Sequence, residues 1–439
     1  MKNNTLRNKI QFHRARIRYT VLPVICLAAF LCGGCSVPIA GDQGAGGEAV
    51  GAMSMESTPV IDYTVPQLFP NVLVDRNGYR VEGSKRAVVK GHKLPESFQL
   101  VDARTKAVVY SAELESVDYD QEQDLYSAYA DFNEWTQAGS YYLECEYVGR
   151  SYEFLLEEDL YERFLSEVCQ EMIAECRNGQ ISIADVNRML LAYEWYGEVF
   201  SDENGDRIPD ILEAVADWID VAGEQEAGLG QEASYAALLA KFSFLYQNYD
   251  RQYATECLRR ASVVFEQSQS GMQKDAECFY ALTELYRATG LDTYMNQIAE
   301  YRTYFESHSN YTEEDGYLYG IMTYMNTRQN VDVELCDIFM DAVMGQGEAI
   351  GGLYQEMLHP LTARNNGTQD LLRHASELAC ANYVVNNYQY NYVMEEFLHY
   401  LGGRNLQSLD FYELEPEYRS QYLLLLTQLS AVQGSTDNQ

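Results

Sequence analysis

Residues 201–222, SDENGDRIPDILEAVADWIDVA, join a polar turn to an amphipathic helix. The first half is rich in Asp, Asn and Gly, which bond nearby backbone or tolerate a positive φ, so it predicts a tight loop. Pro209 favours the start of a helix, because a missing N–H costs nothing in the first turn. Apolar residues then recur at helical spacing and predict one buried face: Ile211, Leu212, Val215, Trp218, Ile219 and Ala222.

The same loop has the ligand spacing of a calcium-binding EF-hand. Counted from Asp202, side chains with oxygen atoms stand at positions one, three, five, nine and twelve, as they do in that motif. Position six is Gly in an EF-hand but Arg207 here. We therefore expect a helix-entry loop and no high-affinity calcium site. The scattered His residues and the absence of a CxxC pair among the seven cysteines beyond residue 35 also predict no other metal site and no cofactor.

Upstream of this segment, residues 65–158 alternate short β-type segments with turn signals. Seven such segments lie at 71–75, 86–90, 98–102, 107–110, 126–132, 141–147 and 152–156. In the sixth, Leu143, Cys145 and Tyr147 alternate with Tyr142 and two Glu residues, so one face is expected to be buried and the other wet. Seven short strands in about ninety residues predict a small β-sandwich of immunoglobulin type.

From residue 159 to 432 the apolar spacing is helical. Stripes of apolar residues follow one another with short breaks at 249–250, 270–271 and 290–291, which predict antiparallel helical hairpins. A helical-repeat adaptor is the alternative, but the chain lacks a fixed period near about 34 residues. Residues 433–439 are expected to form a tail.

Ordered short matches link both regions to a known family. Six segments resemble the immunoglobulin-like domain that precedes many catalytic domains of glycoside hydrolase family 9, the cellulase family: RNGY at 76–79, SKRAV at 84–88, FQLVD at 98–102, ADF at 130–132, GSYYL at 139–143 and SYEF at 151–154. The helical region resembles later family 9 segments: LLAYE at 190–194, RIPDILE at 207–213, YAALLA at 235–240 and LHYLGGRN at 398–405. The resemblance implies a multidomain β + α fold, in which an immunoglobulin-like β-sandwich precedes a shortened (α/α) six-hairpin toroid.

The resemblance also indicates where a catalytic base should lie. Inverting family 9 hydrolases use two carboxyl groups, and one of them activates water. The family's base motif, G-G-W-x-D-A-G-D-Y, is absent from the corresponding interval 176–187. Asp185 is the single carboxylate there, and we expect it in the first turn of a helix that begins at Ser182. The sequence therefore offers no base.

The acid side of the site is also short. The chain passes from Asn405 almost directly into its last helix. Glu415 is the candidate remnant of the acid, and Glu413 or Glu417 could equally fill this role. An acidic residue from elsewhere, such as Glu224 or Glu226, could also have moved into the cleft.

The net charge of the chain excludes some classes of partner. Residues 1–35 hold six basic side chains and no acid, so residues 36–439 carry 25 basic and 66 acidic side chains. Such a negative body repels nucleic acid and anionic membrane surfaces. We expect a polysaccharide or oligosaccharide ligand and no nucleic-acid partner.

Residues 1–35 have the pattern of a lipoprotein signal peptide. A basic start precedes the apolar run 21–31, which is too short to span a bilayer, and CGGC at 32–35 resembles a lipobox. Cys35 would then be lipidated and become the mature N-terminus, whereas a plain N-terminal anchor is the alternative. Residues 36–64 are rich in Gly, Ala and Ser and predict a flexible linker. The prediction is an extracytoplasmic protein whose contact with the bacterial membrane or surface is a lipid anchor.

Two functions from different classes remain open. One is a catalytically degenerate, cell-surface family 9 relative that binds β-glucan or another polysaccharide. The other is an active endo-β-glucanase-type hydrolase in polysaccharide catabolism. We favour the first, because a fold does not establish a function and the residues that the resemblance assigns to the chemistry are missing.

Overall fold

The computed structural model describes residues 70–436, except 122, 224, 226–229, 269–274 and 358–366. The predicted signal peptide, Cys35 and the whole predicted linker therefore lie outside the described residues, as do Glu224 and Glu226. Among the described helices, none has the length and apolar character needed to cross a bilayer.

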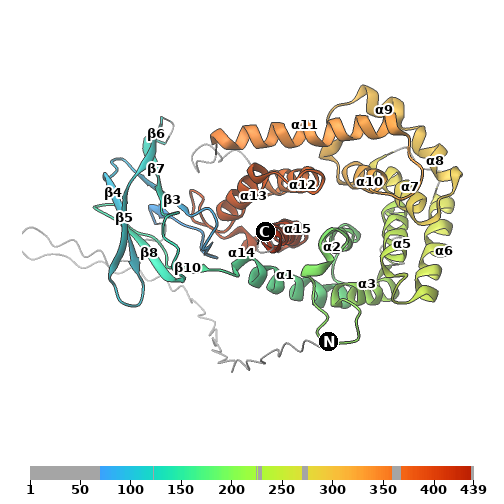
Figure 1. Ribbon diagram of the computed structural model, residues 1–439, viewed down its shortest axis with the longest axis horizontal. Coiled ribbons are helices and arrows are strands. Elements are labelled where there is room, and N and C mark those ends of the chain that lie inside the picture. The colour runs from blue at the N-terminus through green and yellow to red at the C-terminus, as the bar shows by residue number, and fades with distance from the viewer. Residues whose placement is uncertain are drawn as a thin grey trace, which may run out of the picture. The chain divides into compact units, whose positions relative to one another are not determined.

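The N-terminal part is a sandwich of two sheets (Figure 1). The first sheet has the order β1-β3-β7-β6 and the second β2-β10-β8-β4-β5, with β9 paired to β8. The strands are β1 (Val72–Leu73), β2 (Tyr79–Arg80), β3 (Arg86–Gly91), β4 (Ser97–Asp102), β5 (Val108–Glu113), β6 (Glu115–Asp120), β7 (Leu125–Asp131), β8 (Gly139–Cys145), β9 (Gly149–Arg150) and β10 (Phe154–Glu157). The inward faces of both sheets form one apolar core, which includes Val89, Phe98, Leu100, Phe132 and Leu143. The predicted sandwich is confirmed.

The sandwich differs from the prediction in two details. β2, β6 and β9 were not among the seven predicted segments; β2 and β9 have two residues each, and β6 is an exposed edge strand. The predicted alternation in β8 is wrong at its end: Tyr147 is 50% exposed and has φ +50°, because the strand ends at Cys145. Tyr142, expected on the wet face, is buried, and the cations of Lys106 and Arg150 lie over its ring.

The rest of the described chain is helical. Its α-helices are α1 (Leu160–Arg177), α2 (Ile183–Tyr196), α3 (Asp210–Val221), α5 (Glu232–Tyr246), α6 (Arg251–Ser268), α7 (Ala276–Thr289), α8 (Asp292–Ala299), α9 (Arg302–Ser307), α10 (Asp315–Met325), α11 (Val333–Met357), α12 (Thr368–Val384), α13 (Tyr388–Leu401), α14 (Phe411–Leu414) and α15 (Arg419–Thr436). Short 3-10 turns lie at Gly197–Val199, Tyr311–Glu313 and Pro416–Tyr418.

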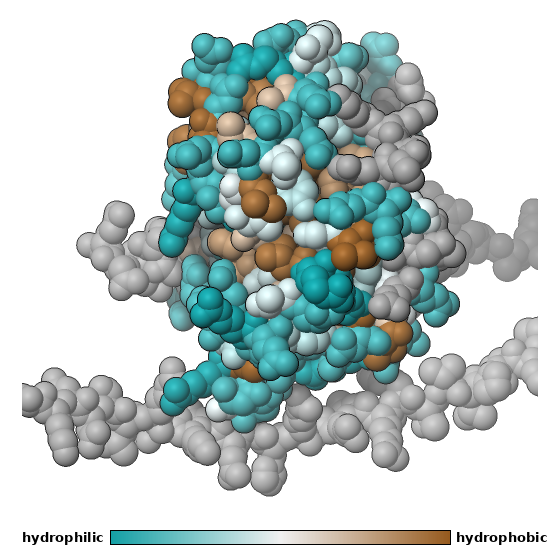
Figure 2. All heavy atoms as spheres, turned by 90° about the vertical axis from the view of Figure 1, so that its right-hand side faces the viewer, coloured by the Kyte–Doolittle hydropathy of each residue, from teal (hydrophilic) through white to brown (hydrophobic). Residues whose placement is uncertain are grey.

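Six of these helices form an inner ring. α2 contacts α5, α5 contacts α7, and contacts continue through α10, α12 and α15 back to α2. The ring helices are the most deeply buried, because they are covered from outside; α6, for example, packs on α5, and α11 packs on α12 and α13 (Figure 1). The six-hairpin toroid is confirmed. The face that includes α6 and α8 is mostly hydrophilic, with apolar side chains in small groups (Figure 2), as expected of a solvated outer layer.

The segment 201–222 folds as its residues predict. Asp202 accepts bonds from the backbone N–H groups of Gly205 (2.7 Å) and Arg207 (2.8 Å). α3 begins after Pro209 and buries its apolar stripe, with Trp218 fully enclosed. Arg207 itself adopts φ +80°, so the missing Gly does not prevent the turn. The loop carboxylates instead bond the backbone, and the described residues hold no group of three potential metal-ligating side chains.

A cluster of buried ions lies inside the ring, toward the C-terminal ends of α2, α5 and α7. Lys241 is fully buried and binds Glu284 at 3.0 Å and Glu194, while Arg287 binds the same two carboxylates. Thr323 of α10 donates a 2.8 Å hydrogen bond to Glu284. Burial alone would raise the pKa of Glu194, but the cations Arg287 and Lys241 overcome this and lower it to about 2. We call Glu194, Lys241, Glu284 and Arg287 the ion cluster. The pairing of their opposite charges offsets the free-energy cost of burying them.

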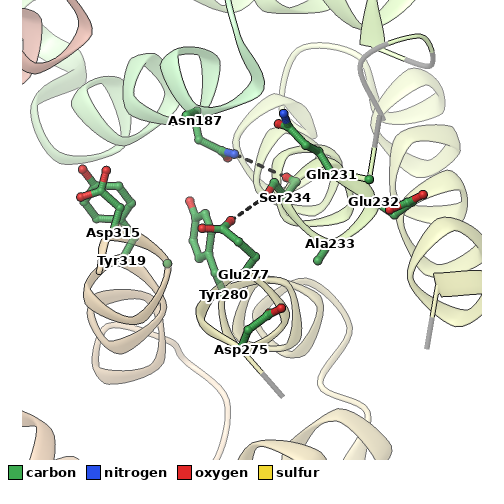
Figure 3. Close-up of a pocket in the computed structure, with 13 residues that line it drawn as sticks. Asn187, Gln231, Glu232, Ala233, Ser234, Asp275, Glu277, Tyr280, Asp315 and Tyr319 are labelled. Carbon is green, nitrogen blue, oxygen red and sulfur yellow. Dashed lines mark hydrogen bonds between the residues drawn. The ribbon is translucent and has the colours of Figure 1, made fainter. Parts of the chain in front are cut away.

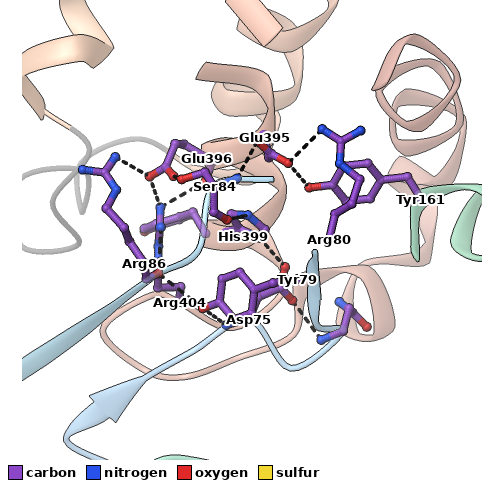
Figure 4. A network of polar contacts seen from close by, with 12 residues as sticks. Asp75, Tyr79, Arg80, Ser84, Arg86, Tyr161, Glu395, Glu396, His399 and Arg404 are labelled. Carbon is purple, nitrogen blue, oxygen red and sulfur yellow. Dashed lines mark hydrogen bonds and ion pairs between the residues drawn. The ribbon is translucent and has the colours of Figure 1, made fainter. Parts of the chain in front are cut away.

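The sandwich and the helices meet through a second set of buried polar contacts (Figure 4). His399 of α13 lies 2.8 Å from the carboxylate of Asp75 and 2.9 Å from the carbonyl oxygen of Ser84. Glu396 accepts a 2.6 Å hydrogen bond from the Ser84 hydroxyl, and it forms a 2.6 Å ion pair with Arg404. The matched segment at 398–405 therefore serves as the junction between the two domains.

Candidate functional site

A cavity of about 550 Å³ opens at the N-terminal ends of four ring helices. Its polar walls come from the first turns of α2, α5, α7 and α10 (Figure 3): Asn187, Gln231, Glu232, Ser234, Asp275, Glu277, Tyr280, Asp315 and Tyr319. The ring helices share a direction at this end, so their first turns bring residues far apart in the sequence to one place.

Ser234 connects the walls of the cavity. Its hydroxyl donates a 2.6 Å hydrogen bond to Glu277, and its backbone carbonyl accepts a 3.4 Å bond from the Asn187 amide nitrogen (Figure 3). Asp275 caps the start of α7 by accepting a 2.9 Å bond from the backbone N–H of Cys278. These contacts hold the side chains of α2, α5 and α7 in fixed positions relative to one another.

Two buried polar atoms in the cavity wall lack a hydrogen-bond partner, and a third faces only a guanidinium group. The first two are the side-chain oxygen of Asn187 and the hydroxyl of Tyr280, and the third is the hydroxyl of Tyr319, beside Arg188; the three residues are only 4%, 2% and 3% exposed. Buried polar groups in folded proteins nearly always have partners, because an unmade bond is costly. Such atoms around one cavity indicate a place where a polar ligand binds.

The carboxyl groups of the cavity differ in their surroundings. Burial, together with the carboxylates of Asp315 and Asp275, raises the pKa of Glu277. Asp315 instead forms a 2.6 Å ion pair with Arg188 of α2. On the neighbouring helix α12, burial raises the pKa of Glu377 to about 7. The ring thus contains carboxyl groups with different proton affinities, an arrangement that clusters at functional sites.

Asp185 is engaged in structural contacts. It forms a capping box with Ser182 at the start of α2, as predicted, and it also accepts a 2.6 Å hydrogen bond from the hydroxyl of Ser420. Arg188 lies 3.3 Å away. Asp185 does not line the cavity, and its oxygens already have partners.

The three candidate acids lie on the short segment before α15. Glu413 belongs to α14, Glu415 follows it, and Glu417 lies in the 3-10 turn Pro416–Tyr418. None of them lines the cavity. One oxygen of Glu415 is buried without a partner, and its charge lies near the buried Tyr422. The structure therefore does not bring Glu415 together with the cavity carboxylates.

Sequence reasoning missed the residues that line the cavity. Asn187, Glu277, Tyr280 and Asp315 each stand within the first turn or two of a ring helix. Polar side chains there interrupt the apolar faces of these helices near their N-terminal ends. This signal can be read from the sequence, but it becomes informative once the ring helices are known to share a direction.

Comparison with known proteins agrees with this architecture. Residues 68–150 match the family model of the cellulase N-terminal immunoglobulin-like domain. No curated protein matches the chain.

Several solved structures share the fold over most of this chain. The Bacteroides ovatus GH9 structure has a TM-score of 0.67 at 14% identity and covers 82% of this chain and 99% of its own. A metagenome-derived glycoside hydrolase family 9 endoglucanase has a TM-score of 0.65 at 16% identity, over 77% of this chain and 84% of its own. AaCel9A, solved in complex with cellobiose-like isofagomine, has a TM-score of 0.62 at 14% identity, over 78% and 84%. The chain is therefore a glycoside hydrolase family 9-like protein in fold, with a cellulase-type immunoglobulin-like domain at its N-terminal side.

Proposed function

We propose that this protein is a lipid-anchored, cell-surface member of the family 9 fold that binds a polysaccharide or oligosaccharide without hydrolysing it. The observation that carries this proposal is the cavity, where the oxygen atoms of Asn187 and Tyr280 are buried and unpaired. Sugar hydroxyls both donate and accept hydrogen bonds, so a saccharide can satisfy such a set.

The loss of catalysis is supported by the two positions where the family resemblance places the chemistry. The one carboxylate near the base position, Asp185, caps a helix and bonds Ser420. Glu415 lies apart from the cavity. Without a base to activate water, a glycosidase forfeits a factor of about 10² to 10⁴ in rate.

One observation favours the alternative, an active endo-β-glucanase-type hydrolase. Glu277, whose pKa burial raises, lines the same cavity as Asp315, which is paired with Arg188. A carboxyl group with a raised pKa beside a second carboxyl group is the combination that glycoside hydrolysis requires.

Reducing-sugar release from soluble β-glucans separates the two functions. The purified full chain is tested beside a Glu413→Gln, Glu415→Gln, Glu417→Gln triple variant and beside Glu277→Gln. We expect no release by any of these proteins but retarded mobility in glucan-containing gels. Turnover that either variant abolishes would establish the hydrolase and name its acid.

The anchor is tested separately. Cys35→Ser should move the protein from the membrane fraction to the soluble fraction and abolish incorporation of labelled fatty acid. Unchanged fractionation and labelling would contradict lipidation at Cys35.

A further inference from the structure

The chemistry of the cavity wall favours one kind of ligand group. The lining residues include four carboxyl groups, from Glu232, Asp275, Glu277 and Asp315, and no Lys, Arg or His. The nearest described cation, Arg188, is already paired with Asp315 and Asp185. A ligand that enters the cavity therefore meets an excess of negative charge.

The hydrogen-bond inventory of the wall points the same way. The Ser234 hydroxyl donates to Glu277, and one N–H of the Asn187 amide donates to the Ser234 carbonyl, so Ser234 has no donor left for a ligand and Asn187 keeps one. The other side-chain donors are the hydroxyls of Tyr280 and Tyr319 and the amide of Gln231. Carboxylate oxygens and the Asn187 oxygen outnumber these donors. The ligand must supply donors.

The helix ends do not reverse this conclusion. Four helix N-termini carry partial positive charge at the cavity, which by itself would attract an anion. Carboxyl groups of the chain already occupy these ends: Asp275 caps α7, and Glu232, Glu277 and Asp315 lie in the first turns of α5, α7 and α10. The attraction for an anion is met internally, and the acceptor excess remains.

We propose that the cavity selects a saccharide with protonated primary amines, an amino sugar in its deacetylated form, over the neutral sugar of the same linkage. An ammonium group has three donors and a positive charge, so it matches both the acceptor excess and the carboxyl groups. The sugar ring and its hydroxyls bond Asn187, Tyr280 and Tyr319. This selectivity rests on the proposed saccharide-binding function.

Three ligands of one backbone test the proposal by calorimetric titration of the full chain at pH 6 and low salt. They are the β-1,4-linked tetramers of glucosamine, of N-acetylglucosamine and of glucose, which differ in the group at C2. We expect the glucosamine tetramer to bind about tenfold more tightly than the other two, which corresponds to about 1.4 kcal/mol. This preference should shrink at 0.5 M NaCl, because salt screens the charges.

Two variants test whether the preference for the glucosamine tetramer arises in the cavity. Glu277→Gln keeps an acceptor for Ser234 and should reduce the preference several-fold, whereas Glu96→Gln, on the exposed surface of the sandwich, should leave it unchanged. Equal affinity for all three tetramers would overturn the selectivity and leave the binding function standing. Failure of all three to bind would overturn both.

A tetralysine peptide separates charge from sugar recognition. We expect it to bind at least about tenfold more weakly than the glucosamine tetramer. Equal affinity for tetralysine would show that the surface responds to charge without the sugar ring, and would overturn the proposal. A preference that Glu277→Gln leaves intact would place the amine elsewhere and overturn it as well.

Discussion

The two ends of the inner helical ring use buried polar groups in opposite ways. The cavity residues Asn187, Ser234, Glu277 and Tyr280 each precede an ion-cluster residue by seven positions, namely Glu194, Lys241, Glu284 and Arg287. Seven residues are nearly two helical turns, about 10 Å, so each pair lies on one face of one helix. At one end every carboxylate contacts a cation, and at the other the Asn187 oxygen and the Tyr280 hydroxyl have no partner.

The difference assigns the stabilisation of the fold to one end and, under the proposed function, ligand binding to the other. Paired buried charges maintain a structure, because breaking one pair leaves an uncompensated charge. Unpaired polar atoms cost stability and persist where a ligand completes their bonds. The predictions below disturb one end at a time, beginning with the largest effect.

Lys241→Ala should destabilise the protein most. It leaves the buried Glu284 with one cation instead of two, and we expect the free energy of unfolding to fall by about 3–5 kcal/mol. Chemical denaturation of the full chain measures it. Arg259→Ala is the control, because Arg259 and Glu256 form an exposed pair on α6 that should contribute nothing measurable. If both variants lost the same free energy of unfolding, the buried ion pairs would stabilise the fold no more than an exposed pair does.

Low pH should destabilise the protein, because it protonates buried carboxylates that are paired with cations. Burial would raise the pKa of Glu396, but Arg404 and Arg86 lower it to about 2, from an ordinary value of 4.5. Because the folded pKa is the lower one, this carboxylate contributes its full stability above about pH 4.5 and loses it as the pH falls toward 2. Protonation of Glu396 should lower the free energy of unfolding by about 3 kcal/mol, and a similar decrease is expected for Glu194. Thermal unfolding at pH 7 and pH 3 measures it, and Glu396→Gln should flatten the dependence. A parallel pH dependence in that variant would contradict the assignment.

The cavity should respond to pH with the opposite sign. The pKa of Glu277 is raised above 4.5, so its stability contribution is present below about pH 4.5 and is lost as the pH rises through the folded value. Glu277→Gln removes this penalty and should raise Tm at pH 8 by about 2–4 °C, with little change at pH 4. Glu96→Gln serves as the control. A lower Tm at pH 8 would mean that the Glu277 charge is stabilising.

Tyr280→Phe should have the smallest effect on stability. It removes a buried hydroxyl without a partner and keeps the ring beneath Lys241, so the free energy of unfolding should rise by about 0.5 kcal/mol. Saccharide affinity should fall at the same time. Differential scanning calorimetry and titration measure the two quantities. A loss of stability would show that the hydroxyl is already satisfied, and would weaken the contrast between the two ends.

The fold could be predicted from the sequence where local pattern and tertiary burial agree. The stripe from Ile211 to Ile219 is such a case, and so are the alternating residues of β4. The edge strand β6 could not be predicted, because neither of its faces is buried. Tyr147 was misplaced because a period of two cannot show where a strand stops.

The site was harder to predict for a different reason. The cavity joins residues between Asn187 and Tyr319 from four helices, and no sequence spacing shows that their first turns meet. An unpaired atom is a property of the packed structure. The resemblance directed attention to Asp185 and Glu415, so it indicated the architecture but not the residues that line the cavity.

The junction between sandwich and helices has a consequence for how such a protein can be divided. The buried side chains of Glu396, His399 and Arg404 find partners on β-sandwich residues, and Gly402 lies so near Asp75 that a Cβ would come within 2.2 Å of its carboxylate. A cut after residue 158 would expose charges that the helices alone cannot neutralise. The sandwich is therefore a permanent part of the helical body and not an interchangeable module, so truncations, domain swaps and gene fusions need to keep both together.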